Sequence, residues 1–182
     1  EHITKAKELG IKNFGENYAQ ELENKAINFD KDVNWHFIGP LQSNKAKIIA
    51  KHADWIHTID RKKIAEKIND ECKKINKIIN ACIQVNISNE STKAGINPEN
   101  LLVFAKYVDS MENINLKGIM VLPSLGENNK KQMQDSKLLH EELVSVFPHA
   151  EFLSMGTTND FETAIVSGSN MIRVGELIFG KR

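Results

Sequence analysis

The sequence predicts an α/β protein, a (β/α)8 TIM-type barrel in which the first strand is missing and seven strands are present. Short apolar runs alternate with amphipathic helical segments along nearly the whole chain. The apolar runs are continuous rather than alternating with polar residues, which is typical of parallel strands buried on both faces. A helical pattern opens the chain with no strand before it, which indicates that the absent strand is the first.

Each element follows from the local pattern. The expected strands are 12–14, 34–39, 54–59, 77–88, 114–122, 151–155 and 170–174. The helical segments that follow them are 15–29, 41–52, 60–76, 98–111, 132–147, 156–169 and 175–180. The opening stretch EHITKAKELG predicts a helix because Ile3, Ala6 and Leu9 share one face and Gly10 follows as a C-terminal stop.

The chain has 182 residues, which predicts one domain, residues 1–182, with no linker or low-complexity segment. A domain rarely opens within a helical pattern, so we expect this domain to be N-terminally truncated. One further βα unit corresponds to about thirty more residues in the full protein. Without that unit, the strands on either side of the gap are expected to have unpaired edges.

Acidic and basic residues are balanced, with 24 of each and a formal net charge of zero. This balance argues against a nucleic-acid-binding protein, which needs a basic surplus to neutralise phosphates. The longest apolar runs are too short for a membrane span, and no signal peptide is visible. Cys72 and Cys82 have neither CxxC nor metal-ligand spacing. We therefore expect a cytoplasmic protein without a nucleic-acid, membrane or metal partner.

Two glycine-containing corners follow the last two strand segments, in FLSMGTTND (152–160) and MIRVGELIFG (171–180). In α/β barrels the site lies at the carboxyl ends of the strands, and the last two strands commonly bind phosphate. Backbone N–H groups at two helix starts, together with hydroxyl groups, predict an anion pocket. Its expected residues are Ser154, Gly156, Thr157, Thr158, Gly175 and Glu176. Turn formation alone is the other interpretation of any single corner.

Other polar residues near the strands have two interpretations each. Arg173 lies within an apolar run, where a guanidinium is costly unless it pairs with a carboxylate or meets a ligand. Asn17 either hydrogen-bonds a ligand or caps a helix. His36 is more typical of a satisfied core histidine than of an acid or base, and nothing around His57 suggests a metal.

Seven motifs run in order from about residue 11 to the C-terminus: FGENYAQE, WHFIGPLQSNK, IHTIDR, QVNISNESTKAG, GIMVLPS, LSMGTTNDFETAI and GSNMIRVGELIFG. In this order and spacing they resemble the pyridoxal phosphate homeostasis protein family, which is related in fold to the N-terminal barrel domain of alanine racemase. The family more often has SMGMS where this chain has SMGTT, and Thr158 keeps the hydroxyl group.

The resemblance implies that pyridoxal 5′-phosphate (PLP) binds in the barrel mouth. It implies that Arg173 faces the pyridine nitrogen and that Asn17 lies near the cofactor. The phosphate contacts that it implies come from Ser154, Thr158 and the backbone around Gly175 and Glu176. The family's Schiff-base lysine lies on the first strand, and no lysine of this chain matches it, so no covalent lysine is assigned.

An arginine cannot accept a hydrogen bond from a protonated pyridine, so Arg173 would hold the ring nitrogen unprotonated and weaken the ring as an electron sink. The leading hypothesis is therefore a PLP-binding protein without strong catalysis of its own. It would act in the homeostasis of PLP and of amino and keto acids, with PLP-dependent apo-enzymes as candidate partners. One alternative is a PLP-dependent amino-acid racemase-like enzyme, although racemases of this fold need a second, β-rich domain. Another is a sugar-phosphate aldolase or isomerase, which needs acid/base pairs where this chain offers amides and serines.

Overall fold

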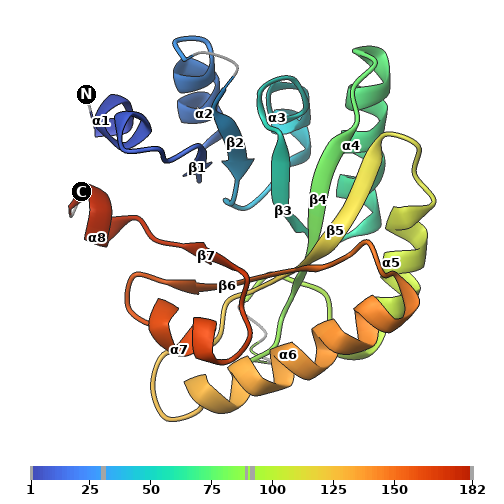
Figure 1. Ribbon diagram of the computed structural model, residues 1–182. Coiled ribbons are helices and arrows are strands. Elements are labelled where there is room, and N and C mark those ends of the chain that lie inside the picture. Colours follow the sequence, from blue (N-terminus) through green and yellow to red (C-terminus); the bar gives the residue numbers. More distant parts are fainter. Residues whose placement is uncertain (1, 30–31, 89, 91–92, 181–182) are drawn as a thin grey trace.

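The computed structural model describes residues 2–29, 32–88, 90 and 93–180. Its main feature is one parallel sheet whose seven strands follow chain order from β1 to β7 (Figure 1). The strands are β1 (Asn13–Glu16), β2 (Asn34–Phe37), β3 (Trp55–Ile59), β4 (Ile79–Val85), β5 (Ile114–Val121), β6 (Phe152–Thr157) and β7 (Met171–Arg173). Every strand expected from the sequence is present, and the predicted TIM-type barrel class is confirmed.

Helices cover the outer side of the curved sheet (Figure 1). They are α1 (His2–Glu8), α2 (Ala19–Ala26), α3 (Ala46–His52), α4 (Lys62–Lys74), α5 (Leu101–Asp109), α6 (Asn129–Val146), α7 (Phe161–Val166) and α8 (Glu176–Phe179), with short 3-10 turns at Ser43–Lys45 and Pro98–Asn100. The opening helix is confirmed from His2 onward, while Glu1 lies outside the described residues. Within the described ranges, no helix combines the length and the apolar composition needed to cross a bilayer.

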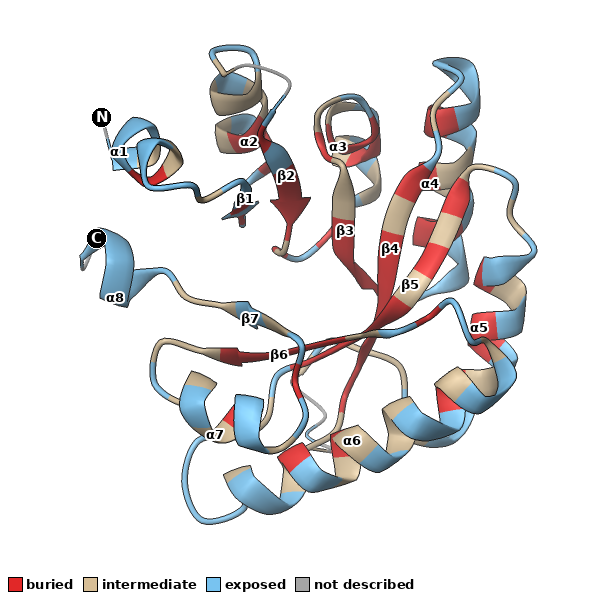
Figure 2. Cartoon of the chain, viewed as in Figure 1, coloured by how far each residue is buried: buried red, intermediate tan, exposed pale blue. Residues whose placement is uncertain are grey.

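The central strands are buried on both faces, which explains their continuous apolar sequences. In β4 every residue except Asn80 is buried, and in β5 residues 118–121 are all buried. Figure 2 shows buried residues concentrated on the sheet, with the outer faces of the helices exposed. The core therefore lies between the sheet and the helices and continues into the interior of the curved sheet.

β1 and β7 form the two ends of the sheet, and no strand pairing joins them among the described residues. They face each other across the open side of the barrel, where α1 and α8 also lie (Figure 1). β7 is short, and none of its residues is fully buried. The two unpaired edges expected from the sequence are therefore present.

Candidate ligand-binding site

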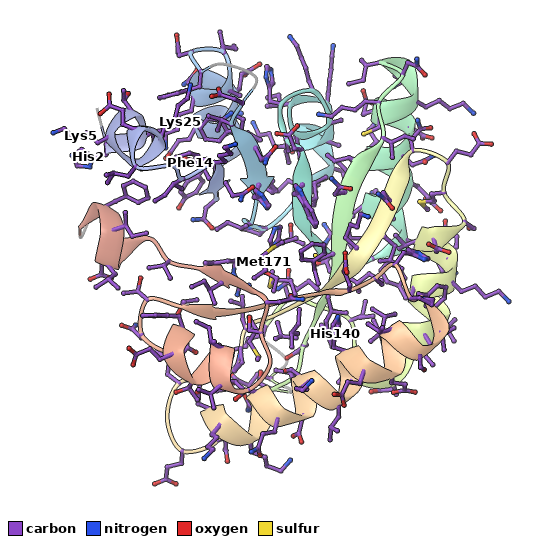
Figure 3. All side chains as sticks on the ribbon, viewed as in Figure 1. His2, Lys5, Phe14, Lys25, His140 and Met171 are labelled. Atoms are coloured by element: carbon purple, nitrogen blue, oxygen red, sulfur yellow. The ribbon has the colours of Figure 1, made fainter. Side chains whose placement is uncertain are left out.

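A cavity of about 1760 Å³ lies between the two ends of the sheet. Its walls come from β1, β2 and β3 on one side and from β6, β7 and α8 on the other. In Figure 3, Phe14 and Lys25 lie on the first side, and Met171 lies on the strand that faces them. The residues expected in the site that line this cavity are Asn17, Thr157, Arg173, Gly175 and Glu176.

Arg173 contributes a half-buried cation to the cavity wall. Its Nη1 donates to the Oγ of Ser154 at 2.7 Å, and its Nη2 donates to the carbonyl oxygen of Val121 at 3.0 Å. Burial lowers the pKa of the guanidinium to about 10, so the group remains charged at neutral pH. Both acceptors are uncharged, so in the described part of the chain Arg173 is not held by the carboxylate pairing that the sequence left open.

Ser154 belongs to a chain of side-chain hydrogen bonds whose three central members are buried. Its Oγ lies 2.9 Å from the Nδ1 of His57, whose Nε2 lies 2.9 Å from the Nδ1 of His36. The Nε2 of His36 lies 3.2 Å from the Oδ1 of Asn13. We name Arg173, Ser154, His57, His36 and Asn13 the histidine relay; its members come from β7, β6, β3, β2 and β1 and cross the interior. Because the Ser154 hydroxyl already has two partners, a phosphate contact through it would replace one of them.

Both imidazoles of the histidine relay are neutral because they are buried. Burial lowers the pKa of His36 to about 4. Burial is the main cause that holds the pKa of His57 well below its usual value, and the neighbouring His36 ring and Arg173 guanidinium lower it further. Trp55 stacks on the ring of His36, with centroids 5.4 Å apart and an interplanar angle of 11°. His36 is thus a satisfied interior histidine, as interpreted from the sequence.

Sequence reasoning missed the histidine relay as a unit. The sequence feature that could have indicated it is the placement of His36 and His57 in the middle of two consecutive strand segments, WHF and IHT. Their partner Ser154 lies 97 residues beyond His57 along the chain, so only the folded sheet brings them together.

Asp160 organises the corner after β6. Its Oδ1 accepts hydrogen bonds from the backbone N–H of Thr157 at 2.7 Å and from the Thr157 hydroxyl at 3.0 Å. The next residue, Thr158, accepts a bond of 3.4 Å from the backbone N–H of Leu177 in α8. β6 also pairs with β7, so the last two corners are adjacent, as expected, and Thr158 connects them.

Asn17 follows β1 and is exposed at the cavity. A Cβ atom at Gly39 would overlap the carbonyl oxygen of Asn17, so the segments after β1 and β2 pass in direct contact. Only glycine permits this approach, and it fixes the backbone of Asn17 beside the cavity. In the loop after β4, residues 89, 91 and 92 lie outside the described residues.

Gly156 is required by the packing of α7. It has a φ of 100°, and a Cβ atom there would lie 2.6 Å from the Cβ of Ala164. Replacing Gly156 by alanine is therefore expected to lower the free energy of unfolding by about 1–3 kcal/mol. Gly175 provides the matched control, because its φ is −120° and no atom lies within 4 Å of an added Cβ.

The loss for Gly175→Ala should stay below about 1 kcal/mol, as for other changes at a helix N-cap. Urea unfolding of both variants measures the difference. Equal losses would contradict the contact with α7 as the reason for glycine at position 156.

Known proteins are similar to this chain over its full length. The family model described as alanine racemase, N-terminal domain, matches residues 1–182. The pyridoxal phosphate homeostasis protein of Pasteurella multocida (strain Pm70) is 42% identical across 100% of this chain and 82% of its own length. The protein of the same name from Escherichia coli (strain K12) is 38% identical across 99% of this chain and 80% of its own length.

Solved structures share the fold. PipY of Synechococcus elongatus PCC7942, solved without PLP, superposes with a TM-score of 0.91 at 31% identity and covers 98% of this chain and 86% of PipY. PipY with PLP bound gives a TM-score of 0.86 at 29% identity, with the same coverage of 98% and 86%. Alanine racemase of Clostridium difficile 630, at 16% identity and a TM-score of 0.77 over 94% of this chain and 46% of its own, shares the fold alone. This chain therefore belongs to the alanine racemase N-terminal domain family and, within it, to the pyridoxal phosphate homeostasis proteins.

Proposed function

We propose that this chain binds PLP in the cavity between the sheet ends and acts in the homeostasis of PLP and of amino and keto acids. The relatives' names and the PipY structure with PLP bound support this ligand. Arg173 is the observation in this chain that carries the proposal. Its charged group lies in the cavity wall, and its hydrogen-bond acceptors are a hydroxyl and a carbonyl rather than a carboxylate. A half-buried cation in this setting favours a ligand that presents an electron-rich acceptor.

The residues around the cavity fit the chemistry of a phosphate ester on an aromatic ring. Hydroxyl and backbone N–H groups suit a phosphate, because they donate without adding charge. We assign the phosphate contacts to Ser154, Thr158 and the backbone of Gly175 and Glu176, beside the turn at Gly156. The Glu176 carboxylate is excluded from these contacts, because two anionic groups repel each other. Asn17 would contact PLP from the β1 side of the cavity.

PLP, when bound, supplies an electron-withdrawing ring that stabilises negative charge at a neighbouring carbon. Arg173 limits this capacity, because a guanidinium only donates hydrogen bonds and so keeps the ring nitrogen unprotonated. A protein with this residue opposite the ring is suited to holding PLP rather than to strong catalysis. We propose PLP-dependent apo-enzymes as the recipients of the ligand. Both cysteines are free and buried, which supports a cytoplasmic location.

We propose that PLP binds this chain without a covalent lysine. In the described part of the chain, Lys25 is the lysine that lines the large cavity. Its ammonium group bonds to the Oε1 of Glu16 at 2.6 Å and to the Oε2 of Glu21 at 3.3 Å. A protonated, ion-paired amine is a weak nucleophile, so Lys25 is not expected to attack the aldehyde of PLP.

Absorbance titration of the purified chain with PLP tests the proposed ligand. We expect a saturable change in the PLP spectrum that inorganic phosphate reverses by competition. Borohydride reduction followed by peptide mapping should leave Lys25 unmodified. A spectrum that never saturates would contradict PLP binding, whereas a pyridoxyl group on Lys25 would contradict only the non-covalent mode.

The racemase-like alternative is distinguished by exchange of the α-proton of alanine in deuterated water. With PLP added, the proposed carrier is expected to exchange this proton no faster than PLP alone. A large acceleration that depends on the protein would favour the enzyme.

A further inference from the structure

The two ends of the histidine relay define the direction of its hydrogen bonds. Arg173 can only donate, so the Oγ of Ser154 accepts its bond of 2.7 Å. At the other end, the Oδ1 of Asn13 lies 3.0 Å from the Nδ2 of Asn34 and 3.2 Å from the Nε2 of His36. This oxygen accepts from both neighbours. The proton positions between the two ends then follow from giving every donor an acceptor.

One arrangement satisfies the four ring nitrogens and the Ser154 hydroxyl of the histidine relay. His36 carries its proton on Nε2, so its Nδ1 accepts from the Nε2–H of His57, whose Nδ1 accepts from the Ser154 hydroxyl. In the reverse arrangement Ser154 would accept from both His57 and Arg173. Its own proton would then have no acceptor in the described structure, on a side chain that is 0% exposed. An unsatisfied buried hydroxyl is destabilising, so the first arrangement is favoured.

The two histidines have no nitrogen left for a ligand, although both line the cavity. Each ring nitrogen of His36 and His57 has a partner within the histidine relay. Trp55 covers one face of His36, and Phe152 in turn packs edge-on against Trp55 with centroids 5.1 Å apart. The rings are therefore held in place, and their effect on the cavity passes through Ser154.

We propose that His57, supported by His36, is a positioning residue for Arg173. By accepting a hydrogen bond from the Ser154 hydroxyl, His57 turns the lone pairs of the Ser154 oxygen toward the Nη1 of Arg173. The guanidinium is thereby held in one orientation in the cavity wall. The effect of this positioning on PLP affinity rests on the proposed function. The orientation of the Arg173 guanidinium itself exists in the chain without ligand.

Histidine-selective 15N NMR of the chain without ligand tests the direction of the relay. At pH 7 both His36 and His57 are expected to be neutral, with the proton on Nε2. A proton on the Nδ1 of His57 would reverse the bond to Ser154 and overturn the proposal.

Two substitutions at position 57 separate the two hydrogen bonds of this ring. Asparagine places its carbonyl oxygen near the former Nδ1 and can still accept from Ser154, whereas glutamine reaches the former Nε2 and keeps the link to His36. His57→Gln is expected to shift the side-chain NMR signal of Arg173 and to weaken PLP binding about fivefold to tenfold. His57→Asn is expected to restore the Arg173 signal and most of the affinity for PLP.

His140→Gln on α6 (Figure 3) is the matched control, because His140 is a half-buried histidine that bonds the carbonyl of Ala150 at 3.1 Å. It should change neither the Arg173 signal nor PLP binding. An unshifted Arg173 signal in His57→Gln would overturn the proposal, and so would equal shifts in both variants at position 57. The Arg173 signal is recorded without ligand. If the chain failed to bind PLP, the proposed function would be overturned, but the NMR comparison of the two variants at position 57 would still decide whether His57 positions Arg173.

Discussion

Between pH 7 and pH 4, the protein is expected to lose about 3 kcal/mol of its free energy of unfolding through His36 alone. The unfolded chain takes up a proton on this residue as the pH falls through the usual histidine pKa of 6.5, whereas the folded chain does so only near pH 4. Stability contributed by the neutral ring is therefore complete above pH 7 and lost on the way down to pH 4. Each pH unit in this window changes the free energy by up to about 1.4 kcal/mol per histidine.

Urea unfolding at several pH values measures this loss, with His36→Asn as the matched variant. His57, His52 and His140 also have lowered pKa values, so the wild-type slope includes their contributions. The comparison isolates His36, because asparagine can accept the bond from His57 but cannot titrate. Between pH 6.5 and 4, the free energy of unfolding should change less steeply with pH in the variant. The difference in slope should correspond to nearly one bound proton. Equal slopes in both proteins would show that the His36 ring does not stay neutral in the folded state.

Replacing Arg173 by methionine is expected to weaken PLP binding by about 10-fold to 100-fold. A hydrogen bond from a charged donor contributes more than a neutral one, and methionine offers no donor to the ring nitrogen. Arg173→Lys keeps the charge but loses the planar fork that reaches Ser154 and Val121 together, so its affinity should be intermediate. Absorbance titration with PLP gives the three affinities.

Inorganic phosphate distinguishes a contact with the ring from a contact with the phosphate group. If Arg173 faces the ring nitrogen, the methionine variant should lose much less affinity for inorganic phosphate than for PLP. A parallel loss of both ligands would instead place the guanidinium on the phosphate. Thermal unfolding of each variant confirms that the fold survives the loss of a donor to Ser154 and Val121.

Much of the fold was predictable because the relevant signals are local. Continuous apolar runs such as GIMV at 118–121 identify buried parallel strands, and Gly10 marks the end of α1 with a φ of 90°. The adjacency of the last two corners also followed, because consecutive strands of such a barrel pair with each other. Each of these inferences needs only the pattern of one segment or the order of neighbouring segments.

The chemistry inside the barrel was not predictable, because it depends on contacts between distant segments. Arg173 was expected to meet either a carboxylate or a ligand, and the sequence could not show that a serine and a backbone carbonyl hold it. Gly156 was attributed to an anion pocket, whereas its contact with Ala164 already requires glycine. That Ser154, Gly156, Thr158, Gly175, Glu176 and Asn17 hold PLP stays a prediction.

The histidine relay also connects the two edge strands of the open barrel, β1 and β7, through side-chain hydrogen bonds. Between neighbouring strands, backbone ladders resist separation, but β1 and β7 are tied across the interior by side chains in series. When hydrogen bonds join two strands one after another, the weakest of them breaks first. Here that is the 3.2 Å contact between the Nε2 of His36 and the Oδ1 of Asn13, at the β1 end. Widening of the cavity therefore requires the loss of a single long hydrogen bond, while every ladder of the sheet stays intact.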